Sequence, residues 1–238
     1  MTLSVVIPAY NERETIRELV DRVRAVPVDK QIIVIDNCST DGTREIVQQI
    51  TCPEVEVILQ DRNRMKGNSV KRGIAAARAE YTIIQDADLE YDPRDYLPML
   101  DAVRSEGVLA ALGSRVLGVQ ESGESLPVSS FALGRDLLND FFNVLFDADL
   151  TDIATCYKLA PTEVFKSLGL QSDGFDLDFE IAAKFVLEAR RRGMVVADVP
   201  IRYYPRTTEE GKKIRWTDGL RSLEAIARYR FPSPSGER

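Results

Sequence analysis

The feature that most limits what this chain can fold into is the alternation of short apolar segments with helical patterns in its first half. Four segments are rich in aliphatic and β-branched side chains, as buried strands are: residues 3–8, 31–36, 55–59 and 81–85. Between them, residues 12–25 carry apolar side chains at helical spacing, and residues 66–79 are rich in alanine. Apolar strands that alternate with helices predict an α/β fold, with a mostly parallel sheet and helices on both faces.

The second half of the chain is less regular but contains no segment that resembles a linker. We expect these elements in order: a strand at 108–114, a glycine-bearing loop at 118–130, an apolar helix at 131–150, a helix at 177–192, a strand at 194–199 and a helix at 216–229. The chain has 238 residues, of which 44% are hydrophobic, so it can bury one sizeable core. We therefore predict a single domain at 1–231 and a disordered tail at 232–238.

The net charge and the absence of histidine argue against two classes of site. Lys and Arg number 31 against 38 Asp and Glu, which gives a net charge of −7 at pH 7. Binding to nucleic acid is not expected, because it requires a basic face. The chain contains no histidine, so a zinc site is not expected either, and a general base must be a carboxylate, a tyrosine or a lysine.

Cysteine usage and hydropathy predict a cytoplasmic protein. The three cysteines, Cys38, Cys52 and Cys156, are an odd and scattered set without metal-ligand spacing, which is typical of a reducing compartment. We expect no signal peptide and no membrane-spanning segment, since no apolar run is long enough. The apolar segment 131–150 is expected to pack in the core or to form a homodimer seam. Peripheral contact with the inner face of a membrane is the alternative.

Polar side chains cluster where three of the predicted strands end. The clusters are residues 8–12 (PAYNE), 36–41 (DNCSTD) and 86–90 (DADLE). The carboxyl ends of parallel strands lie at one edge of a sheet, and the ligands of such sheets bind there. We therefore predict that the three clusters surround one ligand site.

Asp86 and Asp88 follow the fourth predicted strand at positions i and i+2 and are candidates to bind one hard cation. Mg²⁺ and Mn²⁺ are commonly held by one or two carboxylates and take other ligands from a diphosphate and from water. Glu90 continues the same spacing and is a candidate third ligand. The alternative for all three is a solvated acidic loop, since this spacing alone is a weak signal.

Asp36 and Asn37 end the second predicted strand, where a carboxylate and an amide can hydrogen-bond a nucleobase or a ribose. The alternative is that they cap the following turn. Tyr10 is a candidate to lie against a base, and the alternative for Glu12 is a capping position in the first turn of the next helix.

Basic residues in or next to predicted loops are candidates to hold phosphates: Arg115, Arg202, Arg206, Lys212 and Lys213. The alternative is a solvated charged segment. Carboxylates that open the helix at 177–192 either stabilise its dipole or face a reacting sugar. At helical spacing Asp176 and Glu180 share a face while Asp178 points elsewhere, so the three cannot share one role.

Five motifs stand in a fixed order along the chain: VVIPAYNE (5–12), VIDNCSTDG (34–42), NRMKG (63–67), QDADLE (85–90) and GSR (113–115). This set resembles the family 2 glycosyltransferases, and most closely the dolichol-phosphate mannose synthase branch. Residues 150–158 and 206–213 are similar to the soluble bacterial and archaeal members of that branch. The resemblance extends over about residues 1–231.

The resemblance implies a GT-A fold, which is a Rossmann-like α/β arrangement, together with a Mg²⁺ or Mn²⁺ cofactor and inversion at the anomeric carbon. It assigns nucleotide binding to Pro8, Tyr10, Glu12, Asp36, Asn37, Lys66 and Asp86. It assigns metal binding to Asp86, Asp88 and Glu90, and phosphate binding to Arg115, Arg202, Arg206, Lys212 and Lys213. It assigns catalytic roles near the sugar to Asp178, Glu180 and Arg115.

Three departures from the family pattern bear on this assignment. Asn37 stands where a second aspartate is usual, Met65 where glycine is usual, and Glu90 where the mannose synthases usually have glutamine. An amide donates as well as accepts, so Asn37 leaves the preferred base open.

The predicted function is transfer of a sugar from a UDP- or GDP-sugar to a polyprenyl or dolichyl phosphate. The alternative acceptor is a soluble hydroxyl compound, for which Asp178 is the candidate general base. Two further alternatives are a non-catalytic nucleotide-sugar binding protein and a nucleotidyltransferase. The Asp86 and Asp88 pair argues against the first, and residues 9–13 lack the glycine-rich basic loop that the second requires.

Overall fold

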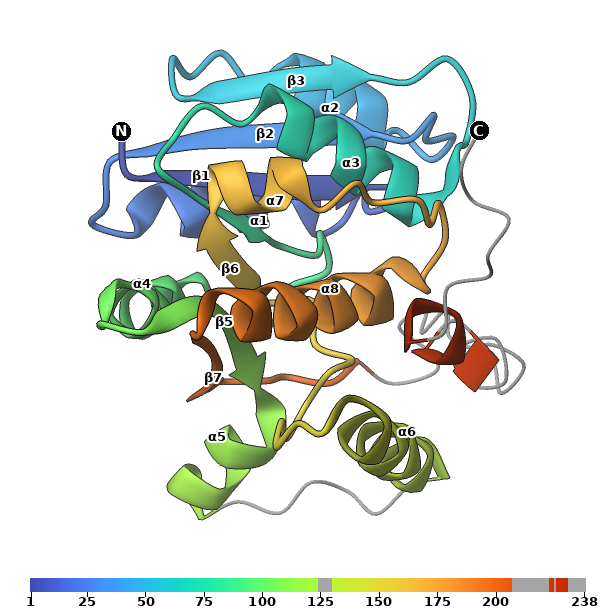
Figure 1. The fold of residues 1–238 in the computed structure, drawn as a ribbon. Helices are drawn as coiled ribbons and strands as arrows, with labels where there is room; N and C mark the ends of the chain where they lie inside the picture. Colours follow the sequence, from blue (N-terminus) through green and yellow to red (C-terminus); the bar gives the residue numbers. More distant parts are fainter. Residues whose placement is uncertain (124–129, 207–222, 225, 231–238) are drawn as a thin grey trace.

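A computed structural model describes residues 1–123, 130–206, 223–224 and 226–230. Seven strands of these residues form one sheet in the order β3-β2-β1-β4-β6-β5-β7 (Figure 1). The strands are β1 (Leu3–Ala9), β2 (Lys30–Asp36), β3 (Val55–Leu59), β4 (Tyr81–Ile84), β5 (Val108–Ser114), β6 (Lys158–Pro161) and β7 (Val195–Pro200). All pairings are parallel except those of β6, which is antiparallel to both β4 and β5. The predicted mostly parallel sheet is confirmed.

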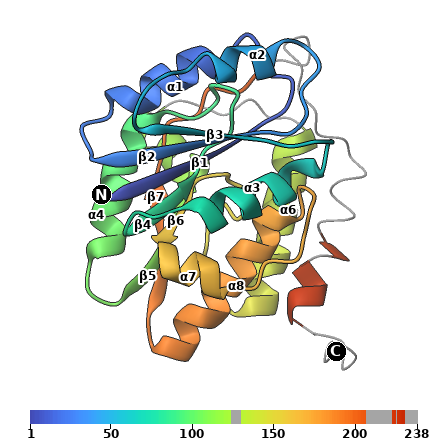
Figure 2. The same ribbon diagram turned by 90° about the horizontal axis from the view of Figure 1, so that it is seen from above.

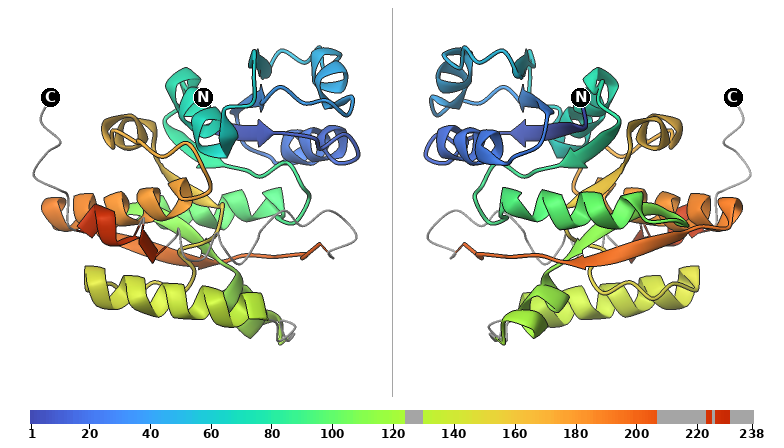
Figure 3. Two further views of the ribbon diagram at one scale, coloured as in Figure 1. Left: turned by 90° about the vertical axis from the view of Figure 1, so that its right-hand side faces the viewer. Right: turned by 90° about the vertical axis from the view of Figure 1, so that its left-hand side faces the viewer.

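Helices cover both faces of this sheet (Figures 2 and 3). They are α1 (Ile16–Ala25), α2 (Thr43–Gln48), α3 (Met65–Ala76), α4 (Tyr96–Arg104), α5 (Arg115–Ser122), α6 (Ser130–Phe146), α7 (Thr162–Ser167) and α8 (Leu177–Arg192), with a short 3₁₀ turn at Pro93–Asp95. Successive side chains of a strand point to opposite faces, so β1 contributes to two cores. Val5 packs with α1 and α4 on one face, whereas Val6 lies in a separate cluster on the other.

Strand register brings the predicted polar clusters to one edge of the sheet. Ala9, at the end of β1, pairs with Asp36, at the end of β2, and Asp36 pairs in turn with Leu59 of β3. Strand β4 lies on the other side of β1 and ends just before Asp86. The loops after these strands therefore adjoin one another, as the sequence predicts.

Helix α6 has one buried face and one exposed apolar face. Phe142 and Phe146 are fully buried, and their rings stack with centroids 4.5 Å apart. On the opposite side, the side chains of Leu137 and Val144 are 65% and 84% exposed. The expected core packing is confirmed for the first face, while the homodimer seam and the membrane contact stay predictions for the second. Within the described ranges, no helix is both long and apolar enough to cross a membrane.

The structure differs from the sequence-based expectation in one predicted loop and in three elements that were not predicted. The predicted loop at 118–130 is wrong over its first part, because α5 continues to Ser122. Strand β6 and helices α4 and α7 were not predicted. In α4 the buried residues Tyr96, Met99, Leu100 and Val103 do follow helical spacing, but the helix is short and carries a proline in its first turn. Strand β6 is four residues long with a lysine and a proline, so it shows no clear apolar period.

The predicted helix at 216–229 lies largely outside the described residues, although residues 223–224 and 226–230 are helical. The predicted tail at 232–238 lies outside them entirely.

Candidate active site

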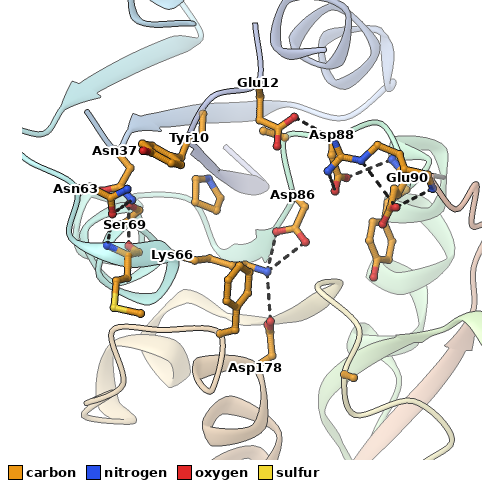
Figure 4. Close-up of a pocket in the computed structure, with 18 of the residues that line it drawn as sticks. Tyr10, Glu12, Asn37, Asn63, Lys66, Ser69, Asp86, Asp88, Glu90 and Asp178 are labelled. Carbon is orange, nitrogen blue, oxygen red and sulfur yellow. Dashed lines mark hydrogen bonds and ion pairs between the residues drawn. The ribbon is translucent and has the colours of Figure 1, made fainter. Parts of the chain in front are cut away.

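A pocket of about 420 Å³ lies at the edge of the sheet where β1, β2 and β4 end (Figure 4). Its walls also come from the β3–α3 loop, the start of α8 and residues 203–206. The predicted site residues that line it are Pro8, Tyr10, Glu12, Asn37, Lys66, Asp86, Asp88, Glu90, Arg115, Asp178 and Arg206. Most of the predicted residues are thus brought together.

Hydrogen bonds join the loops after β1 and β2. The backbone N–H of Glu12 donates to Thr43 Oγ1 over 2.9 Å, and the N–H of Thr40 donates to Asn11 Oδ1 over 2.9 Å. At the end of β2, the N–H of Asn37 donates to the carbonyl of Ala9 over 2.8 Å. The nearly buried side chain of Asn37 is thereby fixed at the pocket wall.

The loop that carries Asp86 and Asp88 is also fixed from both sides. Thr15 Oγ1 donates to the carbonyl of Ala87 over 2.7 Å, and Gln85 Nε2 donates to the carbonyl of Asp86 over 2.8 Å. Gln85 is itself held by the buried hydroxyls of Tyr96 and Tyr157, which donate to its Oε1. The backbone of this loop is thus preorganised before any ligand binds.

Lys66 in the pocket lining and Lys158 beneath it contact the acidic side chains of this part of the site. Lys66 Nζ lies 2.8 Å from Asp86 Oδ1 and 3.2 Å from Asp178 Oδ2. The fully buried Lys158 approaches the same Asp178 carboxylate over 3.5 Å and donates to the carbonyl of Thr155. Burial opposes the ionisation of Asp178, but the two lysines outweigh it and hold the pKa of that carboxyl below its ordinary value.

Arg206 binds the carboxylates at the other end of the pocket. Its guanidinium lies 2.8 Å from Asp88 Oδ2 and 3.2 Å from Glu12 Oε2. Glu90 accepts from the backbone N–H of Arg206 over 2.8 Å and from Tyr203 Oη over 2.9 Å. Burial, together with the nearby charges of Asp86 and Glu90, raises the pKa of Asp88 to about 7.

Asp86 and Asp88 fit a divalent cation. Their oxygens are the hard donors that Mg²⁺ and Mn²⁺ prefer. Burial, and after it the negative charges of Asp86 and Glu90, raises the pKa of Asp88, and a bound cation would offset these charges. No set of three or more carboxylates or thiols in the described residues already converges as a metal site. Glu90 accepts hydrogen bonds from Tyr203 and from the backbone N–H of Arg206, and its role as a third ligand stays a prediction. Two protein ligands leave the other positions to a diphosphate and water.

Arg115 lines the pocket as part of a buried ion pair. Its guanidinium makes a two-point contact with Asp152 over 2.6 and 2.7 Å and lies 5.0 Å from the ring centre of Tyr203. Burial opposes the charge of Arg115, but Asp152 more than compensates and raises the pKa of the guanidinium. Arg115 is therefore a rigid cation rather than a mobile one.

Three predicted site residues have structural partners elsewhere. Asp36 is fully buried and pairs with Arg44 over 2.7 Å, behind the pocket wall. Arg202 binds Asp95 over 2.6 Å on a surface outside the pocket. Glu180 is fully buried and accepts from the backbone N–H groups of residues 171 and 172 over 2.8 and 2.7 Å, so its predicted place near a sugar is wrong.

The separation of Asp178 from Glu180 follows from helical geometry. Residues two positions apart point to different faces of a helix, and here only Asp178 faces the pocket. Lys212 and Lys213 lie outside the described residues.

The structure adds residues that the sequence did not indicate as contributors. Asn63, Ser69, Phe175 and Tyr203 line the pocket, and Lys158 lies beneath Asp178. Asn63 opens a recognised motif and was open to prediction from it. The other residues carry no distinctive local pattern, because only the tertiary fold brings them to the site.

A mostly parallel α/β sheet with paired acidic and basic side chains at the ends of β1, β2 and β4 defines the class of the chain as a GT-A fold. Within that class the chain belongs to glycosyl transferase family 2, whose family model matches residues 4–169. The resemblance seen in the motifs is confirmed.

Two archaeal relatives match most of the chain. The low-salt glycan biosynthesis hexosyltransferase Agl6 of Haloferax volcanii is 29% identical over 225 residues, which cover 93% of this chain and 52% of the relative. The glycosyltransferase AglJ of the same organism is 30% identical over 203 residues, which cover 85% of this chain and 63% of the relative. The chain thus spans about half to two thirds of the length of these curated relatives.

Solved structures confirm the GT-A fold. Mannosyl-3-phosphoglycerate synthase from Rubrobacter xylanophilus superposes with a TM-score of 0.72 at 20% identity, over 100% of this chain and 79% of that chain. Glucosyl-3-phosphoglycerate synthase from Mycobacterium tuberculosis, crystallised with Mn²⁺, UDP and phosphoglyceric acid, gives 0.70 at 20% identity, over 99% and 80% of the respective chains.

Proposed function

We propose that the protein is an inverting, metal-dependent glycosyltransferase that moves a hexose from a nucleoside diphosphate donor to a polyprenyl phosphate. The observation that carries the proposal is the division of one pocket into two ends. Asp86, Asp88, Lys66 and Arg206 form a charged end, and Tyr10, Asn37 and Asn63 an uncharged end (Figure 4). This division matches a donor with a neutral base and a charged diphosphate.

The charged end suits departure of a nucleoside diphosphate. A bound divalent cation would be held by Asp86 and Asp88 and would supply charge stabilisation to the leaving diphosphate. Lys66 and Arg206 would turn from these carboxylates to the phosphate oxygens and add two further positive charges. The acceptor oxygen forms a bond to the anomeric carbon as the bond to the diphosphate oxygen breaks, which inverts that carbon.

The state of Asp178 favours an acceptor that arrives ionised. A general base must take a proton, but two lysines stabilise Asp178 as a carboxylate and lower its basicity. A phosphate acceptor already carries a nucleophilic oxygen and requires no base. Asp178 is then better suited to accept hydrogen bonds from sugar hydroxyls. In support of a lipid phosphate, a dolichol-phosphate mannosyltransferase of Pyrococcus furiosus is 33% identical over 118 residues, covering 48% of this chain and 33% of that protein.

Transfer assays with radiolabelled UDP- and GDP-hexoses test the proposal. The expected result is a labelled lipid product when polyprenyl phosphate and Mn²⁺ are present, and its loss with EDTA or in the D88A variant. The D101A variant changes a carboxylate of α4 outside the pocket and should keep wild-type activity. Full activity of D88A would remove the metal assignment, and transfer only to soluble hydroxyl compounds would overturn the acceptor.

A further inference from the structure

The uncharged end of the pocket is where a nucleobase fits. Tyr10, Asn37, Asn63 and Ser69 lie together there, on the opposite side from Asp88 and Glu90 (Figure 4). A base is neutral at pH 7, whereas the diphosphate is drawn to the lysine and arginine of the other end. Selection among bases must therefore depend on the hydrogen-bonding groups of this end.

Backbone N–H groups fix the orientation of two amide side chains at this end. Asn63 Oδ1 accepts from the N–H of Met65 over 2.9 Å, and Asn37 Oδ1 accepts from the N–H of Arg64 over 2.8 Å. A backbone N–H can only donate, so the atom that faces it must be the oxygen of each amide. Asn37 Nδ2 then donates to Asn63 Oδ1 over 3.1 Å, which couples the two side chains.

This arrangement leaves the two pocket-lining side chains with more donors than acceptors. Both lone pairs of Asn63 Oδ1 are used, by Met65 and by Asn37, so Asn63 offers the two hydrogens of Nδ2. Within the described part of the chain no partner contacts that nitrogen. Asn37 keeps one N–H and one lone pair. The pair thus presents three N–H groups and one acceptor position.

We infer that Asn63, oriented by Asn37, reads the donor's base and selects a pyrimidine over guanine. The edge of uracil has two carbonyls and one N–H, and that of cytosine two acceptors and one amino group. Guanine instead places a ring N–H and an amino group beside a single carbonyl. A donor-rich protein edge pairs with the pyrimidines and sets N–H against N–H with guanine. This inference rests on the proposed function, because it names the donor class of the same pocket.

The coupling also gives a reason for the asparagine at position 37. A carboxylate there would place an oxygen about 3 Å from Asn63 Oδ1, without a hydrogen between them. A substitution at position 37 therefore disturbs the loop as well as the base. An N63D change disturbs the loop less than a change at position 37, because the oxygen that accepts from Met65 and Asn37 is retained. Only the outward group changes, from a donor to an acceptor.

Isothermal titration with UDP, CDP and GDP in the presence of Mn²⁺ tests the inference. Wild type should bind UDP and CDP at least about tenfold more tightly than GDP, which is the fold-change for one mispaired group. In N63D the affinity for UDP should fall about tenfold, while that for GDP stays or rises, because the new carboxylate accepts from guanine. The N68A variant, on α3 but outside the pocket lining, should keep the wild-type ranking.

The outcomes separate this inference from the proposed function. Equal binding of the three nucleotides by wild type, or a preference for GDP, overturns the pyrimidine selection and leaves a glycosyltransferase standing. An N63D protein with unchanged UDP affinity, or with an equal loss for all three nucleotides, overturns the role of Asn63. If N63D does not fold, the order of the wild-type affinities for UDP, CDP and GDP still tests the selection of a pyrimidine over guanine. Failure of wild type to bind any of the three overturns both proposals.

Discussion

The backbone of Met65, a residue of the pocket wall, has a strained conformation. It opens α3 with a φ of 69°, in the left-handed region, although its side chain is 53% exposed and gains little from burial. The hydrogen bond from its N–H to Asn63 Oδ1 holds the turn in this shape. The residue that follows is Lys66, so the strained turn directs this lysine into the pocket.

The M65G variant should therefore be more stable than wild type. Left-handed backbone costs a non-glycine residue about 1–2 kcal/mol, and the added flexibility of glycine in the unfolded chain costs about 0.5–1 kcal/mol. The expected net gain is about 0.5–1 kcal/mol in the free energy of unfolding, measured by urea titration. M65A removes the side chain but keeps the strain, so it should show no gain. A gain of equal size in M65A would contradict the backbone explanation.

Lys158 is the buried lysine that the predicted site did not include. We expect K158M to raise the pKa of Asp178, because one of the two charges that stabilise the carboxylate is lost. The folded-state pKa of Asp178 is depressed, so its stabilising contribution is present above the unfolded pKa and is lost as pH falls through the folded value. The acid limb of the pH–activity profile should therefore move to higher pH in K158M.

Lys184, a partly exposed lysine that also pairs with a buried carboxylate, provides the control for K158M. Lys184 pairs with the buried Glu180 over 2.6 Å. Both residues are on α8, the helix that carries Asp178, but neither lines the pocket. Both K158M and K184M should lower the free energy of unfolding, by about 1–3 kcal/mol each. Only K158M should shift the pH profile of transfer. An unshifted profile in K158M would show that Lys158 serves stability alone.

At the scale of elements, α6 offers the described surface best suited to a lipid acceptor. Its exposed apolar side chains, Leu137 and Val144, lie two turns apart on the face opposite Phe142. An apolar helix face of this kind can lie in the interface of a bilayer, and the proposed polyprenyl phosphate resides there. The dimer seam remains the competing use of the same face.

An L137E/V144E double variant tests this use of α6. Burial of one leucine-sized side chain contributes about 1.5–3 kcal/mol, so the partition coefficient onto vesicles should fall by roughly tenfold or more. Flotation with anionic vesicles measures the bound fraction. The V195E variant changes an exposed valine of β7 and should float like wild type. Equal flotation of the double variant would exclude this face, and a change from dimer to monomer would assign it to self-association.

Some strands and site residues could be predicted from the sequence, whereas others depend on contacts that only the folded chain makes. Strands β1, β2, β4 and β5 follow their apolar runs closely, because strands buried on both faces need such runs. The edge strand β3 is only partly buried, yet it also matches its predicted range. The antiparallel strand β6 was not predicted, because its four residues include Lys158. A lysine is not expected in a buried strand, and this one is paired with Asp178 only in the folded chain. At the site, strand-end position located Asp86 and Asn37 correctly. It could not show that Asp36 and Arg202 are paired with Arg44 and Asp95.

On the scale of the whole molecule, the pocket joins parts of the chain that are distant in sequence. The family model matches residues 4–169, which provide the loops after β1, β2 and β4. Asp178, Tyr203 and Arg206 lie beyond that range and close the pocket from the other side. A bound ligand therefore contacts both parts, and its binding free energy stabilises the whole fold rather than one loop.

Thermal unfolding should reveal this linkage and its dependence on metal. At a UDP concentration of 100 times Kd the folded state gains about 2.7 kcal/mol, which corresponds to a rise in Tm of roughly 5–10 °C for a chain of this length. The rise should require Mn²⁺, because without it the diphosphate approaches the carboxylates of Asp86 and Asp88. In D88N one of those negative charges is absent, so UDP alone should raise Tm at least as much as in wild type. The further rise on adding Mn²⁺ should disappear in D88N, and its persistence would show that Asp88 does not bind the metal.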